Sequence, residues 1–233
     1  MITPASSFQP LIPVIAIDGP SASGKGTVAQ RVAEALGFHY LDSGALYRVV
    51  AFATYQRNID WHDANAVAEC AKILQINFKN ERVLLNGSDI SNEIRSEAMG
   101  KGASQVAVHA PLRAALVALQ HRFRQPPGLL ADGRDMGTVI FPDAMLKVFL
   151  TASTEVRAQR RYQQLLGKNE SASYENILAD LQERDARDKG RSSAPLVMAD
   201  DAILLETDNL SISDAVNVVL THFQHKINNK SHK

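Results

Sequence analysis

Gly19-Pro-Ser-Ala-Ser-Gly24-Lys25-Gly26-Thr27 directly follows the apolar run Val14–Asp18 and leads into a helical pattern. A β-branched strand, a loop bounded by glycines and a helix that opens with Lys and Thr form the arrangement of a phosphate-binding P-loop. Backbone N–H groups of such a loop form a cradle for an anion, and the helix N-terminus adds the positive end of its dipole. The stretch therefore predicts a nucleoside triphosphate site, with Lys25 at the outer phosphates.

This loop departs from the general P-loop pattern at one position. The residue after the lysine, normally the Ser or Thr that contacts Mg²⁺, is Gly26, and the hydroxyl follows at Thr27. The change disfavours a regulatory GTPase, where that hydroxyl is a direct metal ligand. A chance match in a Gly/Ser-rich turn is the alternative, and the preceding strand and following helix argue against it.

Composition limits the classes of partner. The 233 residues are 45% hydrophobic and 21% charged, as in ordinary globular proteins. Lys+Arg and Asp+Glu both number 25, and this balance argues against nucleic acid or an anionic membrane as the main partner. A single cysteine, Cys70, excludes an internal disulfide. Residues 1–13 lack a signal-peptide pattern and no apolar run is long enough to span a membrane, so we expect a cytoplasmic protein.

Short apolar runs alternate with helical patterns along the chain. Strands are predicted at 14–18, 39–42, 128–132, 145–152 and 202–207, and the first two precede helices at 26–36 and 45–57. This order predicts an α/β fold, a P-loop NTPase-like five-stranded parallel sheet with helices on both faces. Ligands of such sheets bind beyond the carboxyl ends of the strands. The polar residues that follow strands, at 18, 42–44 and 132–135, should therefore meet near the P-loop.

Residues 65–125 break this alternation. Runs at 76–78 and 82–85 flank a short polar connection and predict an antiparallel hairpin. Residues 91–108 have a mixed helical pattern, and a helix is expected from Ala110-Pro111 to about Arg124. We interpret this region as an insert between the second and third core strands, and residues 226–233 as a frayed polar tail.

A second cluster of charged residues lies at 183–191. Helical spacing places Arg184, Asp188 and Arg191 on one face, at i, i+4 and i+7. Two guanidinium groups beside a carboxylate suit a ligand that carries phosphate and hydroxyl groups. The alternative is a solvated helix face with internal ion pairs.

An arginine-rich helix is predicted just before this cluster. Thr154 is the candidate N-cap, the arginines are Arg157, Arg160 and Arg161, and a polar loop follows at 167–170. Such a helix–loop–helix is either a lid that closes over phosphates or a plain surface hairpin.

Other residues carry weaker signals. Arg48 lies one helical turn after 42–44 and is either an anion ligand or an ordinary surface arginine. His222 and His225 have no third metal ligand nearby, so we expect a solvated pair. Packing roles are expected for Tyr40, Tyr47 and Trp61.

Four motifs together resemble the bacterial cytidylate kinases over residues 13–223. They are the P-loop, Leu41-Asp-Ser-Gly-Ala-Leu-Tyr-Arg48, Ala131-Asp-Gly-Arg-Asp-Met-Gly-Thr138 with 139–143, and Glu183-Arg-Asp with Asp188 and Arg191. The resemblance implies a five-stranded core, a lid and a large monophosphate-binding insert. We divide the chain accordingly into core segments 13–64, 128–153 and 173–225, an insert at 65–127, a lid at 154–172, and flexible ends at 1–12 and 226–233.

The resemblance also implies residue roles. The donor ATP would lie on Gly19, Pro20, Ser21, Ala22, Ser23, Gly24, Lys25, Gly26 and Thr27. The cytosine edge would be read by Ser104, Arg113, Asp135 and Arg191, the ribose held by Arg184 and Asp188, and the monophosphate by Ser43, Arg48 and Arg134. Catalytic charges would come from Lys25, Arg134, Arg157, Arg160 and Arg161. Thr27 and Asp132 would hold Mg²⁺ through water. One departure is Ala22, where many relatives carry glycine, and we expect a shifted ATP affinity at most.

The implied reaction is transfer of the γ-phosphoryl group of MgATP to CMP or dCMP by a monomeric enzyme. The acceptor phosphate is mostly a dianion at pH 7, so it needs no general base, and charge and positioning would supply the catalysis. Two alternatives stay open: a kinase of this fold that acts on UMP, AMP or another small acceptor, and a P-loop nucleotide sensor that transfers nothing.

Overall fold

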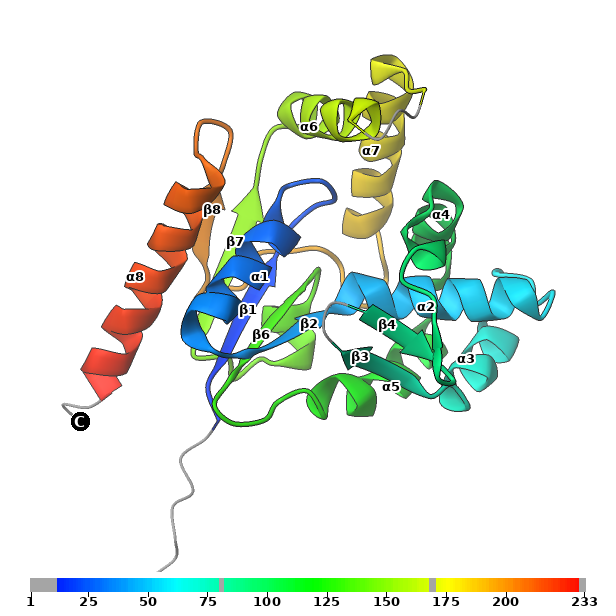
Figure 1. Ribbon diagram of the computed structural model, residues 1–233, viewed down its shortest axis with the longest axis horizontal. Coiled ribbons are helices and arrows are strands. Elements are labelled where there is room, and N and C mark those ends of the chain that lie inside the picture. The colour runs from blue at the N-terminus through cyan, green and yellow to red at the C-terminus, as the bar shows by residue number, and fades with distance from the viewer. Residues whose placement is uncertain (1–11, 80–81, 168–170, 231–233) are drawn as a thin grey trace, which may run out of the picture.

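A five-stranded parallel sheet forms the centre of the computed structural model, which describes residues 12–79, 82–167 and 171–230 (Figure 1). The strand order is β2-β6-β1-β7-β8. The bounds are Val14–Asp18 (β1), His39–Asp42 (β2), Leu129–Gly133 (β6), Leu146–Thr151 (β7) and Ile203–Glu206 (β8). The predicted fold class is confirmed, and each strand end lies within one residue of the sequence prediction.

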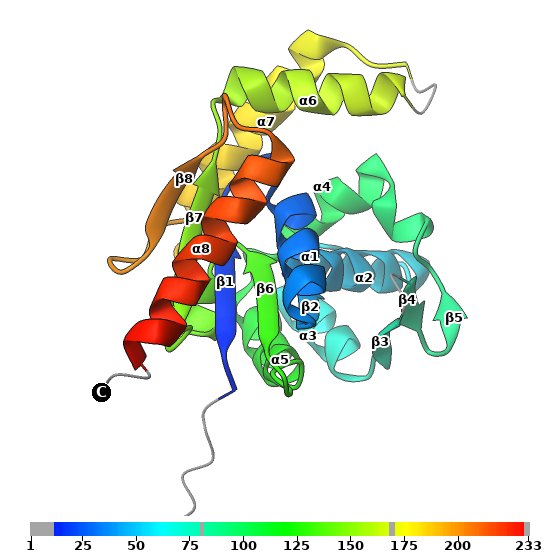
Figure 2. The same cartoon turned by 60° about the vertical axis from the view of Figure 1, so that its left-hand side comes forward.

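Helices cover both faces of the sheet. Ile15 and Ile17 of β1 pack on one face against α1 (Lys25–Leu36) and α8 (Ile212–Lys230), which lie side by side in Figure 2. Val14 and Ala16 point to the opposite face, toward α2 (Ser43–Gln56), α5 (Ala110–His121) and a single π-helical turn, η2 (Met136–Ile140). A strand buried on both faces is apolar throughout, which explains why it appears as an unbroken apolar run.

The P-loop between β1 and α1 has two tight points. A Cβ on Gly19 would lie 1.9 Å from the carbonyl oxygen of Leu150 on β7, so only glycine fits there. Gly24 caps α1 with φ 89°, a left-handed conformation that glycine adopts without strain. Ala22 also has positive φ, 57°, where an alanine carries strain that glycine would not. The departure noted in the sequence therefore falls on a strained residue.

A second, antiparallel sheet lies between β2 and β6 in the chain. Its order is β3-β4-β5, over Ile76–Lys79, Arg82–Leu85 and Ser88–Asp89. The β3–β4 hairpin is confirmed, and β5 was not predicted. The surrounding helices are α3 (Ala64–Lys72), η1 (Glu93–Arg95), α4 (Glu97–Val106) and α5. Trp61 packs against Gly102 of α4, which confirms its packing role.

Helices α6 (Thr154–Leu166) and α7 (Tyr174–Lys189) stand beyond the carboxyl ends of the strands (Figure 1). The N-cap of α6 is Ser153, whose Oγ accepts from Val156 N, so the prediction of Thr154 was wrong by one residue. Residues 168–170 of the predicted polar loop lie outside the described residues. Helix α8 continues to Lys230, into the segment predicted as a frayed tail; 231–233 and 1–11 are not described.

Candidate active site

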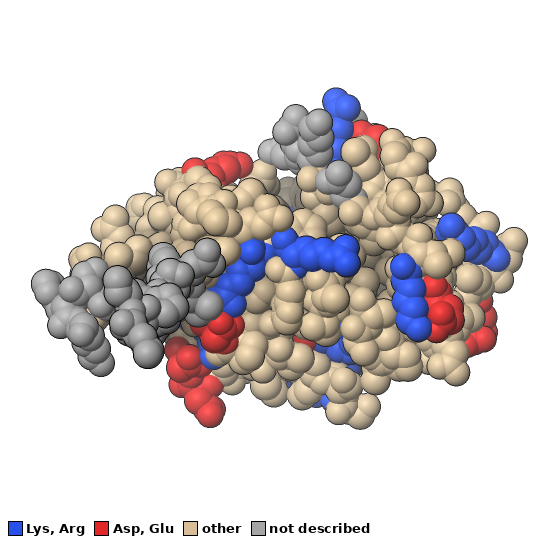
Figure 3. Space-filling view, turned by 90° about the horizontal axis from the view of Figure 1, so that it is seen from below, with Lys and Arg blue, Asp and Glu red and all other residues tan. Residues whose placement is uncertain are grey.

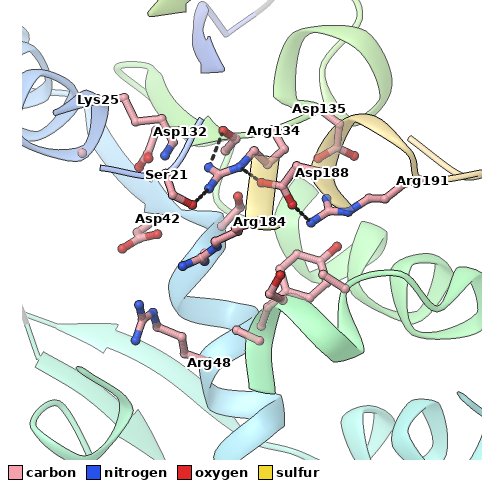
Figure 4. A pocket seen from close by; sticks show the side chains of 18 of the residues that line it. Ser21, Lys25, Asp42, Arg48, Asp132, Arg134, Asp135, Arg184, Asp188 and Arg191 are labelled. Atoms are coloured by element: carbon pink, nitrogen blue, oxygen red, sulfur yellow. Dashed lines mark hydrogen bonds and ion pairs between the residues drawn. The ribbon is translucent and has the colours of Figure 1, made fainter. Parts of the chain in front are cut away.

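A cavity of about 250 Å³ opens where β1, β2 and β6 end (Figure 4). Of the polar residues predicted to meet there, 42–44 and 132–135 line the cavity together with part of the P-loop, whereas Asp18 does not. Arginines from α2, α5, α7 and the segment after α7 complete the wall. The lining residues from the predicted set are Ser21, Ala22, Lys25, Gly26, Ser43, Arg48, Ser104, Arg113, Asp132, Arg134, Asp135, Arg184, Asp188 and Arg191.

The P-loop end of the cavity holds a half-buried lysine facing two carboxylates. Burial, with the charge of Arg134, lowers the pKa of Lys25 to about 8, against the pull of Asp132 and Asp42. Burial and the charge of Asp42 raise the pKa of Asp132 to about 7. The Tyr40 hydroxyl donates a 2.7 Å hydrogen bond to Asp132 Oδ1, and burial raises the pKa of that phenol. Both shifts disfavour the charged forms; a bound anion would favour the charged form of Lys25, and a bound cation that of Asp132.

Asp18 supports the loop that carries the next polar residues. Its two carboxylate oxygens accept hydrogen bonds of 2.8 Å from the backbone N–H groups of Met136 and Gly137, at the start of η2. Burial raises the pKa of Asp18 to about 6, although these hydrogen bonds oppose the rise. Asp18 does not line the cavity; it ties the end of β1 to the 132–135 segment.

Arg134 joins the P-loop to the second charged cluster. Its Nη2 donates to Ser21 Oγ at 2.6 Å, and its Nε donates to Asp188 Oδ2 at 2.7 Å (Figure 4). Asp188, 1% exposed, also pairs with Arg191. Burial would raise the pKa of Asp188, but Arg134 and Arg191 hold it below its ordinary value. Helix α7 ends at Lys189, so Arg191 lies beyond the helix and not on its face as predicted, yet it reaches the same carboxylate.

A second buried ion pair lies on the other side of Asp188. Arg113 of α5 pairs with Asp135, donates to the Ala107 carbonyl at 3.3 Å, and stacks over the Tyr47 ring at 5.8 Å. The pKa of Asp135 is raised by burial, against the charges of Arg113 and Arg191. Ser104 of α4 lines the same cavity.

Two further arginines face the cavity with incomplete pairing. Burial and the charge of Arg134 lower the pKa of Arg184 to about 10, and among the described residues its Nε has no hydrogen-bond partner. Arg48 donates to the carbonyls of Ile94 and Ser96 at 2.9 and 3.2 Å, and burial lowers its pKa. Among the described residues neither arginine forms an ion pair with a carboxylate, so an anion bound between them would meet cations that the protein does not fully neutralise.

The three arginines of α6 have different environments. Arg157 is 3% exposed, pairs with Asp185 at 2.5 Å and donates to the Ser21 carbonyl at 3.1 Å. Arg160 donates to Thr207 at 3.1 Å and, at 3.5 Å, to the Ser23 carbonyl. Arg161 instead pairs with Glu97 of α4 at 2.8 Å, across the cleft between α6 and α4. Arg157 and Arg160 therefore lie against the P-loop, and Arg161 links α6 to α4 by one partly exposed pair.

The residues fit a Mg²⁺ ion bound together with a nucleotide. Asp132 is a buried oxygen donor whose raised pKa a cation would lower, and Asp42 and Tyr40 supply oxygen atoms beside it. Among the described residues no three His, Cys, Asp or Glu side chains cluster to hold a metal by themselves. This matches a magnesium site completed by phosphate oxygens and water. Thr27 is exposed and does not line the cavity.

Comparison with known proteins assigns this chain to a family. The family model for cytidylate kinase matches residues 15–225. The chain belongs to the cytidylate kinase family. A cytidylate kinase of Burkholderia vietnamiensis is 58% identical over 217 residues, 93% of this chain and 95% of the relative. One of Cupriavidus necator is 57% identical over 213 residues, 91% and 96% of the two chains. A gluconokinase structure from Sinorhizobium meliloti covers 95% of this chain and 97% of its own, with 16% identity and a TM-score of 0.48.

Sequence reasoning missed several residues of this family member's site. Tyr40 was expected only to pack, yet its hydroxyl binds Asp132. Asp42, beside the predicted Ser43, was noted only as a polar residue after a strand. Arg187 lies three residues after Arg184 and so shares the predicted helix face, but the prediction did not single it out. The position of each at the end of a strand or within a motif was a signal that could have found it.

Charge is distributed unevenly over the molecule. On the face seen from below, Lys and Arg are interspersed with Asp and Glu (Figure 3). The cavity, in contrast, gathers Lys25 and five arginines against four aspartates. The net charge of the whole chain is zero, but the cavity is locally positive. No described helix has both the length and the apolar character needed to cross a membrane.

Proposed function

We propose that this protein transfers the γ-phosphoryl group of MgATP to CMP or dCMP. The observation that carries the proposal is the position of Arg134, which donates both to the P-loop serine and to Asp188. One guanidinium thus spans the expected donor and acceptor sites within a single cavity. Family membership and relatives named cytidylate kinase support the choice of acceptor.

The residue roles follow the geometry of the cavity. The triphosphate would lie on the P-loop with Lys25 at its outer phosphates, and Arg157 and Arg160 lie against that loop's carbonyls. The acceptor phosphate would contact Arg48, Arg134 and Ser43. Ribose would lie between Arg184 and Asp188, and the base would face Ser104, Arg113, Asp135 and Arg191.

A bound Mg²⁺ would neutralise charge on the donor phosphates, with Asp132 as the carboxylate that would hold it and Asp42 and Tyr40 in support. The side chains of the protein would position the two substrates and stabilise the negative charge on the transferring phosphoryl group. The acceptor phosphate is already dianionic near pH 7 and needs no base. The cationic side chains of the site repel one another in the free protein. Their interactions become favourable once the negative charge of the phosphates lies among them.

We further propose that α6 and α7 form a lid that closes over the phosphates and excludes water, which otherwise accepts the phosphoryl group. The Arg161–Glu97 pair already joins α6 to α4 of the insert. A monomeric state and a cytoplasmic location are part of the same proposal.

The test is ADP release from MgATP with CMP, dCMP, UMP, AMP, GMP or no acceptor. Release with CMP and dCMP and little without acceptor is expected. Release with another monophosphate would keep the reaction and refute the base-reading roles; ATP binding with no release would favour a nucleotide sensor. Arg184→Ala should weaken CMP binding and spare ATP binding, with the exposed Lys189→Ala on the same helix as control.

A further inference from the structure

The hydroxyl of Ser104 has a charged partner from a distant part of the chain. Ser104 is buried on α4, and its Oγ accepts a 2.8 Å hydrogen bond from Arg187 Nη1 on α7. Arg187 is in turn paired with Glu183, one turn earlier on that helix. The guanidinium is therefore held from one side by Glu183 while it donates to the serine on the other.

Ser104 lines two adjoining spaces, and Arg187 lines only one of them. Ser104 lines the 250 Å³ cavity that contains Asp135 and Arg113. Arg187 does not; it lines the adjoining cleft of about 620 Å³ between α4 and the α6–α7 pair. The hydrogen bond to Ser104 is therefore the contact through which Arg187 would act on the proposed base site.

The contact decides what the hydroxyl offers to a ligand. A serine hydroxyl has one proton to donate and two lone pairs that accept. The guanidinium occupies one lone pair, and its positive charge turns the O–H bond away from it. With Arg187 in place the serine presents a hydrogen-bond donor to the cavity. Without Arg187 the hydroxyl rotates freely and accepts as readily as it donates.

We propose that Arg187 is a positioning residue for base selection, an inference that rests on the proposed function. Asp135, held by Arg113, presents an acceptor in the same cavity. An acceptor and a fixed donor together match a base edge with an amino group beside an unprotonated ring nitrogen, as in cytosine. Uracil presents the reverse, a carbonyl beside an N–H. Arg187 therefore contributes to the preference for CMP over UMP by keeping Ser104 a donor.

The experiment is a double-mutant cycle read as the ratio of kcat/KM for CMP to that for UMP. The variants are Arg187→Ala, Arg187→Lys, Ser104→Ala, the Arg187→Ala/Ser104→Ala double variant, and Lys189→Ala as a control that removes a charge from the same helix outside the contact. We expect Arg187→Ala to lower the ratio by about tenfold, the worth of one charge-assisted hydrogen bond. Arg187→Lys should retain most of the ratio, and Lys189→Ala all of it.

The cycle separates positioning from general structural damage. In the Ser104→Ala background, Arg187→Ala should change the ratio no further, because the two act through one hydroxyl. An unchanged ratio in Arg187→Ala, or an equal fall in both backgrounds, would overturn the inference. If Arg187→Ala does not fold, Glu183→Gln loosens the guanidinium and should lower the ratio in the same direction. Absence of CMP-dependent turnover in the unsubstituted protein would instead refute the proposed function.

Discussion

Replacement of Asp132 by asparagine is expected to stabilise the free protein while it disables the enzyme. The carboxylate is 4% exposed at the end of β6, with Asp42 nearby. Asparagine keeps the shape and can still accept the 2.7 Å hydrogen bond from Tyr40. The substitution therefore removes the buried negative charge and little else.

The size of the effect follows from the pKa of Asp132, about 7 against an ordinary 3.8. At about 1.4 kcal/mol per pKa unit, the ionised carboxylate costs the folded state up to about 4 kcal/mol above pH 7. Attraction to Lys25 is already contained in that pKa, so it is not subtracted again. Local relaxation around the charge reduces the figure, and we expect a gain in unfolding free energy of about 2–4 kcal/mol at pH 8.

The sign of the pH dependence is fixed by the direction of the shift. Below pH 4 the carboxyl is protonated in both states, and the variant gains nothing. Between pH 4 and 7 the unfolded chain releases its proton first, so the stability of the unsubstituted protein falls as pH rises. Above pH 7 the full penalty is present. The gain from Asp132→Asn should therefore grow from pH 5 to pH 8.

Urea unfolding at pH 5, 6, 7 and 8 measures this difference, with the exposed Asp200→Asn as the control for loss of one aspartate. MgATP-dependent phosphorylation of CMP should fall by about a hundredfold or more in Asp132→Asn, because the carboxylate proposed to hold the metal is gone. A variant less stable than the parent at pH 8, or a gain equal at every pH, would refute the reasoning.

Three further outcomes are expected. Ala22→Gly relieves the strain of the left-handed backbone but gives the unfolded chain more freedom. The free energy of unfolding in urea should therefore change by less than about 1 kcal/mol, and the KM for ATP by only a fewfold. A larger loss of stability would contradict the strain at Ala22. Asp18→Ala leaves the N–H groups of Met136 and Gly137 without acceptors. It should lower the free energy of unfolding in urea by about 2–4 kcal/mol and raise the KM for CMP. An unchanged stability would show that water replaces the carboxylate. Arg161→Ala breaks a half-exposed pair, so stability should change by less than about 1 kcal/mol; a fall in kcat of a hundredfold in steady-state assays would place Arg161 at the transferring phosphoryl group.

The sheet and the P-loop could be predicted from the sequence because their signals are local. A strand buried on both faces appears as an apolar run, and the glycines mark backbone positions where a side chain does not fit, as the Leu150 carbonyl 1.9 Å from a Cβ on Gly19 shows. The convergence of 42–44 and 132–135 followed from the rule that parallel strands end at one edge. The hairpin of β3 and β4 followed from its short polar connection.

Pairings between distant segments could not be predicted in this way. Helical spacing placed Arg191 on a face of α7, but the helix ends at Lys189 and Arg191 reaches Asp188 from the following turn. Nothing local to Arg187 or Ser104 indicates that they meet, since α4 and α7 are brought together only by the tertiary fold. The residue roles that came from family resemblance could not be obtained from spacing, and they stay predictions.

The internal carboxylates explain how a neutral chain holds a site for two polyanions. Asp188 fixes Arg134 and Arg191, and Asp135 fixes Arg113, so the guanidinium groups are aimed before any ligand arrives. A site ordered by its own ion pairs needs little reorganisation when negative charge appears, which is the condition for strong electrostatic stabilisation. The cost falls on Lys25 and Arg184, which form no ion pair with a carboxylate in the part of the chain that the structure describes, and whose pKa values are lowered by burial and by Arg134. Those two cations gain most from a bound phosphate, so nucleotide binding should both order the site and stabilise the fold.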